Sequence, residues 1–262
     1  MKTAGCSVFG IASVASPSSA SRGRQSNNSK NYEIKNLLRS GNKEEAYDLC
    51  DEIGVIYTHN TTKFSSKELV QEANNTDGSA AVDGVSTQKR WGDPDNDPDS
   101  EMTVSAVALG GDDESGYQYV IFNWDLADAA GADCHGPLDG AAISFSEDIY
   151  RLRKDQTKTK GNTLVETVPH VHGVYAKLQT GRMAPTYSGS GWMETEIDTR
   201  DDELGAETNI YGELIHTWDP FCSPSNIGIS WSLPGPGEFD VSISGSGQDW
   251  KAKTFTTHTA EP

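Results

Sequence analysis

Four aspartates alternate with other residues in the segment 91–100, WGDPDNDPDS: Asp93, Asp95, Asp97 and Asp99. Calcium takes roughly six to eight oxygen ligands, and alternating carboxylates in a tight loop supply several of them. The segment lacks the glycine and the final glutamate of an EF-hand loop, so it matches that motif only in part. It therefore fits a possible calcium site, or a solvated acidic linker held extended by its prolines, which is the commoner meaning of such a sequence.

Three histidines form a second candidate metal site. His170 and His172 flank Val171 in a predicted strand, so both imidazoles would point to one face. His216, in another predicted strand, is the best candidate for a third ligand to zinc or another transition metal. No HExxH or similarly specific pattern accompanies them, and satisfied or solvent-facing histidines are more common.

The cysteines allow one disulfide. Cys134 and Cys222 both lie in loop-like stretches, and an oxidising exterior would permit a bond between them. Cys50 would then be the odd thiol, and the alternative is that all three stay unpaired. His135 follows Cys134 directly, but sequence neighbours seldom have the geometry of a nucleophile and its base.

The remaining catalytic patterns are missing or uninformative. The chain has no G-x-S-x-G elbow, no glycine-rich phosphate loop and no dinucleotide fingerprint. Its 39 acidic residues guarantee chance carboxylate pairs, so no pair singles itself out for glycoside hydrolysis. The sequence therefore names no catalytic residue.

Six tryptophans suggest a surface for stacking sugar rings. Trp192 follows a Gly/Ser turn and is the tryptophan expected to be most exposed, which makes it the candidate ligand-binding residue. Trp124, Trp218, Trp231 and Trp250 lie in predicted strands, where burial against a facing sheet is the usual role.

Three N-x-S/T sequons offer candidate glycosylation sites in an exported chain. They begin at Asn27, Asn60 and Asn74, all in the N-terminal third. Chance occurrence in a chain rich in Asn, Ser and Thr explains them equally well.

Hydrophobic periodicity changes along the chain. Apolar residues recur at helical spacing on both sides of the turn at Ser40-Gly41-Asn42, and Gly54 is a plausible helix stop. We therefore predict a small helical segment at 32–77, including a short strand near 55–57 and a helix at 65–73, then an acidic connector at 78–100. From 101 to 262 about ten alternating stretches are separated by turns, which predicts an antiparallel β-sandwich. The strand predictions are 103–109, 117–125, 141–145, 164–168, 171–178, 191–197, 209–218, 227–233, 239–244 and 250–257.

The net charge of −18 is the sharpest global property. Such a chain repels nucleic acid phosphates and anionic lipid, so neither is expected as a partner. At molar salt the Debye length is about 3 Å and the self-repulsion nearly vanishes, so the composition suits a saline environment. An ordinary acidic protein from a low-salt environment is the alternative.

Residues 1–20, MKTAGCSVFGIASVASPSSA, combine a lysine, a modestly apolar run and small residues near a possible cleavage site. This pattern predicts a signal peptide, followed by a flexible linker at 21–31. Because the charged region is almost missing, the start resembles the later part of a twin-arginine signal, which implies that the true start lies upstream. The alternative is a buried small-residue helix. No stretch is long and apolar enough for a transmembrane helix.

The C-terminal part carries a family resemblance. His216-Thr217-Trp218 is followed by the strand-like segment IGISWSLPGPGEFDVSISGSGQDW, and the segment 117–126 ends in Asn-Trp-Asp-Leu. Loosely over 30–257, these features resemble exported proteins of unknown function from haloarchaea, with relatives in spore-forming bacteria. The resemblance implies a β-rich fold and an extracellular location, but no activity.

Together these features favour a secreted or cell-surface, non-enzymatic binding protein. Its partner would be a surface glycan or a protein of unknown identity, and calcium is the one cofactor suggested. A secreted hydrolase using a metal or carboxylates is the alternative. Convergence of histidines or carboxylates in one concave pocket would favour the hydrolase, whereas a concave area lined by aromatic residues would favour binding.

Overall fold

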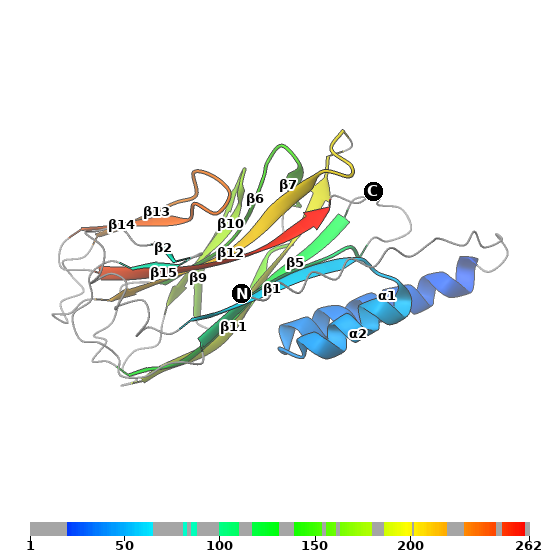
Figure 1. Ribbon diagram of the computed structural model, residues 1–262, viewed down its shortest axis with the longest axis horizontal. Helices are drawn as coiled ribbons and strands as arrows, with labels where there is room; N and C mark the ends of the chain where they lie inside the picture. The colour runs from blue at the N-terminus through cyan, green and yellow to red at the C-terminus, as the bar shows by residue number, and fades with distance from the viewer. Residues whose placement is uncertain are drawn as a thin grey trace.

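The computed structural model contains two packed antiparallel sheets, with two helices on one outer face and a β-hairpin on the other (Figure 1). The predicted fold class, an antiparallel β-sandwich preceded by a small helical segment, is confirmed. Within the described part of the chain, neither helix is long and apolar enough to cross a bilayer. The described residues are 20–64, 81–82, 85–87, 100–109, 117–130, 139–153, 156–160, 163–179, 186–200, 202–218, 228–244 and 248–259.

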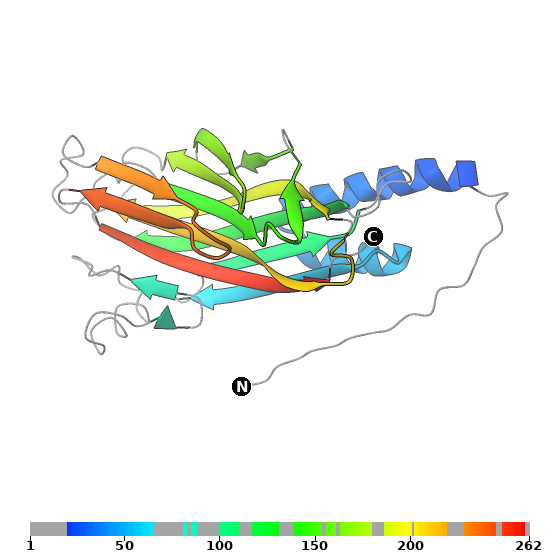
Figure 2. The same ribbon diagram turned by 90° about the horizontal axis from the view of Figure 1, so that it is seen from above.

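Sheet A has the strand order β1–β4–β5–β11–β7, and β8 also pairs with β11. Sheet B has the order β2–β3–β15–β12–β6–β10–β9, with β12 and β15 side by side along its length (Figure 2). The strands of sheet A are β1 (Tyr57–Phe64), β4 (Ser100–Val107), β5 (Tyr117–Ala130), β7 (Tyr150–Leu152), β8 (Lys158–Lys160) and β11 (Thr186–Thr199). Those of sheet B are β2 (Ala81–Val82), β3 (Val85–Thr87), β6 (Asp139–Phe145), β9 (Thr163–His170), β10 (Gly173–Gln179), β12 (Glu207–Trp218) and β15 (Gln248–Thr259).

The main core lies between the sheets and follows the alternation of strand side chains. In β5, Val120, Phe122 and Trp124 join the cluster shared with sheet B. The alternate residues Tyr119 and Ile121 pack in a second cluster with the helices on the other face. Both faces of β5 are therefore buried over residues 117–122, which accounts for the nearly continuous apolar run in this part of its sequence.

The helices are α1 (Ala20–Arg39) and α2 (Lys43–Ile53), and they form the predicted hairpin. The turn between them contains Gly41, whose φ of 81° is a left-handed conformation that glycine adopts at little cost. Gly54 ends α2 in the same conformation, with the amide of Val55 bonded to the carbonyl of Cys50 at 2.9 Å. Both signals were readable from the sequence.

Residues 21–31 differ from the prediction of a flexible linker, because α1 begins at Ala20. The segment contains no apolar stripe, and it was the absence of that stripe that suggested a linker. Helix extension is cooperative, however: once Ile34 and Leu38 are buried in the second cluster, adding a further residue to an existing helix costs little. The polar extension of α1 projects beyond the ends of the strands (Figure 2).

The sandwich also begins earlier than the predicted boundary at residue 101. The strand β1 spans all eight residues from Tyr57 to Phe64 and pairs with β4, and the short strands β2 and β3 extend sheet B. As an edge strand of sheet A, β1 is rich in threonine and has no apolar alternation, which is why periodicity did not reveal it. The predicted helix at 65–73 lies outside the described residues.

A separate hairpin, β13 (Gly228–Ser232) and β14 (Asp240–Ser244), covers the outer face of sheet B. It is attached through Glu213, which is only 5% exposed. The amide of Phe239 donates to Oε1 of Glu213 at 3.0 Å, and the hydroxyl of Ser144 donates to Oε2 at 2.9 Å. The amide of Gly237 donates in turn to the Ser144 hydroxyl at 2.8 Å.

Gly212 sets the spacing between the two sheets. A methyl group at this position would overlap the buried ring of Phe122 from the opposite sheet. We expect Gly212→Ala to lower the free energy of unfolding by about 1–3 kcal/mol, the usual cost of overpacking a core, measured by urea denaturation. Gly235→Ala is the control, because its methyl would meet only the flexible end of Glu238. Equal effects of the two substitutions would contradict this packing.

Candidate functional site

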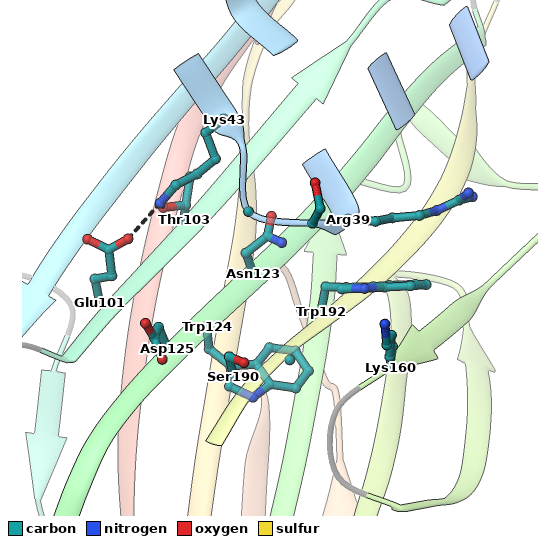
Figure 3. A pocket seen from close by; sticks show the side chains of 13 residues that line it. Arg39, Lys43, Glu101, Thr103, Asn123, Trp124, Asp125, Lys160, Ser190 and Trp192 are labelled. Carbon is teal, nitrogen blue, oxygen red and sulfur yellow. Dashed lines mark hydrogen bonds and ion pairs between the residues drawn. The ribbon is translucent and has the colours of Figure 1, made fainter. Parts of the chain in front are cut away.

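A pocket of about 670 Å³ lies on the outer face of sheet A, beside the turn between α1 and α2 (Figure 3). The helices cover part of this face, and the pocket begins where they turn back. Its walls come from the turn and from strands β4, β5, β8 and β11. The lining residues that carry the chemistry are Arg39, Lys43, Glu101, Thr103, Asn123, Asp125, Lys160, Ser190 and Trp192.

Strand register aligns these side chains in two rows. In the first row Thr103, Asn123, Trp192 and Lys160 are successive partners across four neighbouring strands. In the second row Glu101, Asp125 and Ser190 are partners in the same way. Directly opposite residues present their side chains on one face about 5 Å apart, so the two rows form a continuous polar surface.

Arg39 fixes the end of α1 to this surface. Its Nε and Nη2 each donate to a different carboxylate oxygen of Glu194 at 2.6 Å, a bidentate pair with a carboxylate only 3% exposed. The hydroxyl of Tyr119 donates to the same carboxylate at 2.6 Å. The hydrogen bonds to Glu194 raise the pKa of Arg39 above its usual value, and burial raises the pKa of Tyr119. Arg39 therefore stays charged and Tyr119 stays neutral.

Lys43 fixes the start of α2 in the same manner. Its Nζ donates to Glu101 at 2.7 Å and to the hydroxyl of Thr103 at 2.8 Å (Figure 3). The two helices are thus joined to sheet A on both sides of the turn. The position of the turn, which forms one wall of the pocket, follows from these two attachments.

Trp192 is the predicted ligand-binding residue that the structure places in the pocket. It is half-buried rather than fully exposed. The guanidinium of Arg39 lies 5.6 Å from the centre of its ring, a cation–π contact that orients the indole. The sequence 188–191 before it, predicted as a turn, continues β11 with a register shift between Tyr187 and Gly189. Trp124 is buried, as expected.

Asn123, Asp125, Lys160 and Ser190 were not identified from the sequence. Their segments are far apart in the chain, and only the pairing register of β5, β8 and β11 brings them together. The one signal available was that polar residues alternate with apolar ones in these strands. Such alternation shows which side chains of one strand share a face, but it does not show which strands pair with one another.

The three predicted histidines do not form one site. His170 ends β9 and His172 lies in the turn before β10, with ring centres 5.4 Å apart. His170 is paired with Gly173, which is paired with Ser144 and through it with Tyr211. His216 is five residues beyond Tyr211 along β12, which separates those two residues by about 17 Å at strand spacing. His172 lies instead near Glu147, with 3.8 Å between Nδ1 and Oε2.

Several predicted sites lie outside the described residues: Asp93, Asp95, Asp97 and Asp99, the cysteines Cys134 and Cys222, and Asn74. Asn27 belongs to α1, and Asn60 is an exposed residue of β1. Cys50 is a free thiol in the cluster beneath the helices, and burial raises its pKa to about 12. It is therefore protonated at neutral pH and a poor nucleophile.

Within the described residues, no group of three or more His, Cys, Asp or Glu side chains could hold a metal ion. The carboxylates that line the pocket are Glu101 and Asp125. Glu101 is occupied by Lys43, whereas Asp125 is exposed. The arrangement is suited to hydrogen bonding with a polar ligand.

Comparison with known proteins gives no family. No family model matches the chain, and no curated protein matches its sequence. One solved structure, from work on the pH-induced modulation of Streptococcus parasanguinis adhesion by Fap1 fimbriae, is similar over 74% of this chain and 94% of that chain. The two share 10% identity with a TM-score of 0.28. What indicates a function in this protein is therefore the pocket itself.

Proposed function

We propose that the protein is a non-enzymatic binding protein that works outside the cell in high salt, and that the pocket beside the α1–α2 turn is its binding site. The pocket carries this proposal. Its volume of about 670 Å³ lies in the range of small-ligand sites. It combines an oriented aromatic ring with polar side chains held on strands, which position them more precisely than loops do.

The state of the carboxylates supports binding over hydrolysis. A two-carboxylate mechanism needs one group free to donate a proton and a second free to attack or to activate water. Glu101 is bound by Lys43 at 2.7 Å, so Asp125 is the lining carboxylate left without an ion-pair partner in the described part of the chain. The histidines of the alternative metal-dependent hydrolase are divided between the two ends of sheet B.

The net charge of the chain supports a saline environment for this function. A net charge of −18 destabilises a compact chain in dilute solution, and molar salt removes most of that cost. The signal-like residues 1–20 and the resemblance to exported haloarchaeal proteins support a location outside the cell.

The test uses the labelled full chain and isolated cell envelopes of the source organism in molar sodium chloride. We expect the protein to sediment with the envelopes, and Asp125→Ala to weaken binding about tenfold. Asp202→Ala is the matched control, since Asp202 is also exposed but lies outside the pocket. Mass spectrometry of the supernatant should find no released envelope fragments.

Two results would count against the proposal. If Asp125→Ala and Asp202→Ala bind envelopes equally well, the pocket is not the binding site. If the wild-type protein releases soluble fragments and Asp125→Ala does not, the protein is a hydrolase that uses this carboxylate.

A further inference from the structure

The described residues at the pocket carry almost no net charge, although the chain as a whole is strongly acidic. Its cations are Arg39, Lys43 and Lys160. Arg39 is neutralised by Glu194 and Lys43 by Glu101. Lys160 and Asp125 remain, both exposed and opposite in sign. Among the described residues, an anionic ligand would therefore meet Lys160 beside the like charge of Asp125, and a cationic ligand would meet Asp125 beside the like charge of Lys160. Neither sign of ligand charge is favoured.

Hydrogen-bonding groups in the pocket are mixed in kind. Asp125 only accepts hydrogen bonds, Lys160 only donates them, and the Ser190 hydroxyl does both. A phosphate or carboxylate ligand needs donors alone, and an ammonium ligand needs acceptors alone. Ligand hydroxyl groups, which donate and accept, match alternating donors and acceptors.

Two buried atoms in the first row have no hydrogen-bond partner in the part of the chain that the structure describes. They are Nε1 of Trp192, a donor, and Oδ1 of Asn123, an acceptor. The two residues are register partners on adjacent strands, so both side chains belong to the same face. Both atoms are closed off from the pocket, so hydrogen bonds to a ligand would come from the exposed groups of Asp125, Ser190 and Lys160.

Trp192 adds an apolar surface to this polar set. Arg39 packs against one face of its ring, and Trp192 is bonded into β11 between β5 and β8. An indole held in this way loses little conformational freedom when a ligand packs against it. Sugar rings combine apolar C–H faces with hydroxyl edges, and this combination is the one the pocket offers.

We propose that the ligand is a neutral carbohydrate, with a sugar unit packed against Trp192 and its hydroxyls bonded by Asp125, Ser190 and Lys160. This inference rests on the proposed function and names its ligand class. Trp192 and Asp125 are the residues whose loss affects sugar binding most.

The test is calorimetric titration of the full chain in molar sodium chloride with neutral disaccharides: maltose, cellobiose, mannobiose and N,N′-diacetylchitobiose. Inorganic phosphate and glucuronate serve as the anionic comparison. We expect at least one neutral sugar to bind, and neither anion to bind more tightly. Asp125→Asn and Trp192→Ala should each weaken that sugar about tenfold or more. Trp192→Phe, which keeps a smaller ring for the sugar to pack against, should fall between wild type and Trp192→Ala.

Trp231→Phe is the matched control, because Trp231 lies in the β13–β14 hairpin on the other sheet. Asp125→Asn changes an exposed side chain and so keeps the test independent of any loss of folding in Trp192→Ala. Absence of binding by every neutral sugar, tighter binding of phosphate or glucuronate, or equal affinity in wild type and Asp125→Asn would each overturn the inference. Envelope binding that depends on Asp125 without sugar binding would overturn it while leaving the proposed function standing.

Discussion

Replacing Glu213 with glutamine is expected to stabilise the protein by about 3 kcal/mol above neutral pH and to change little near pH 4. Burial raises the pKa of Glu213 from 4.5 to about 7, against the opposing effect of hydrogen bonds from Phe239 and Ser144. The folded protein therefore holds a proton that the unfolded chain releases. This contribution to stability is complete below about pH 4.5 and is lost as the pH rises through about 7. Glutamine mimics the protonated side chain at every pH.

The measurement is urea unfolding of both proteins between about pH 4 and pH 9 at constant molar salt. The free energy of unfolding is plotted against pH for each protein. The difference between these two curves reports the titration of one carboxylate among 39 acidic residues. Glu238→Gln, an exposed change in the same hairpin, should give a curve parallel to that of the wild type. A difference between wild type and Glu213→Gln that stays constant with pH would show that Glu213 is not the titrating group.

The second large effect is expected at the junction of α1 and β11. Arg39→Met leaves the Glu194 carboxylate, 3% exposed, without its bidentate partner. Removing one member of a buried ion pair costs about 3–5 kcal/mol, because the remaining charge stays desolvated. We expect a loss of this size in the free energy of unfolding, again from urea denaturation.

A second substitution distinguishes the cost of leaving a buried charge unpaired from the cost of losing the packing of Arg39. The double variant Arg39→Met with Glu194→Gln removes both charges but keeps an oxygen for the Tyr119 hydroxyl, so it should recover much of the loss. Arg151→Met is the control, since Arg151 is 65% exposed and its pair with Asp198 is 3.3 Å long. Such a surface pair contributes less than about 1 kcal/mol. Equal costs for Arg39→Met and Arg151→Met would show that the Glu194 pair is not desolvated.

The fold class was predictable because burial leaves a periodic pattern. The segment 117–125 alternates between two apolar sets, and the helical spacing around Ser40 predicts the hairpin that is observed. Edge elements leave no such pattern. The strand β1 is polar and rich in threonine, and the first turns of α1 have no apolar stripe, so both were assigned to other structures.

The candidate site was predictable only at Trp192, whose type and neighbours marked it as a residue on an accessible surface. Its partners Asn123 and Lys160 are ordinary polar residues in sequence, and their role depends on register between strands that the sequence does not specify. The histidine hypothesis was wrong about geometry because it depended on where a strand ends. His170 and His172 were placed within a strand, whereas His172 lies in the hairpin turn that follows β9.

The contacts under the helices make the two parts of the molecule respond to dilution in opposite directions. Lys35, Arg39 and Lys43 each bind a glutamate of sheet A, in a chain whose remaining surface has a surplus of negative charge. Dissolved ions weaken attraction and repulsion alike. At low salt the acidic surface of the sandwich would therefore repel itself most strongly just when these three ion pairs are strongest. The attachment of the helical hairpin to sheet A through Lys35, Arg39 and Lys43 is accordingly expected to strengthen as salt is diluted.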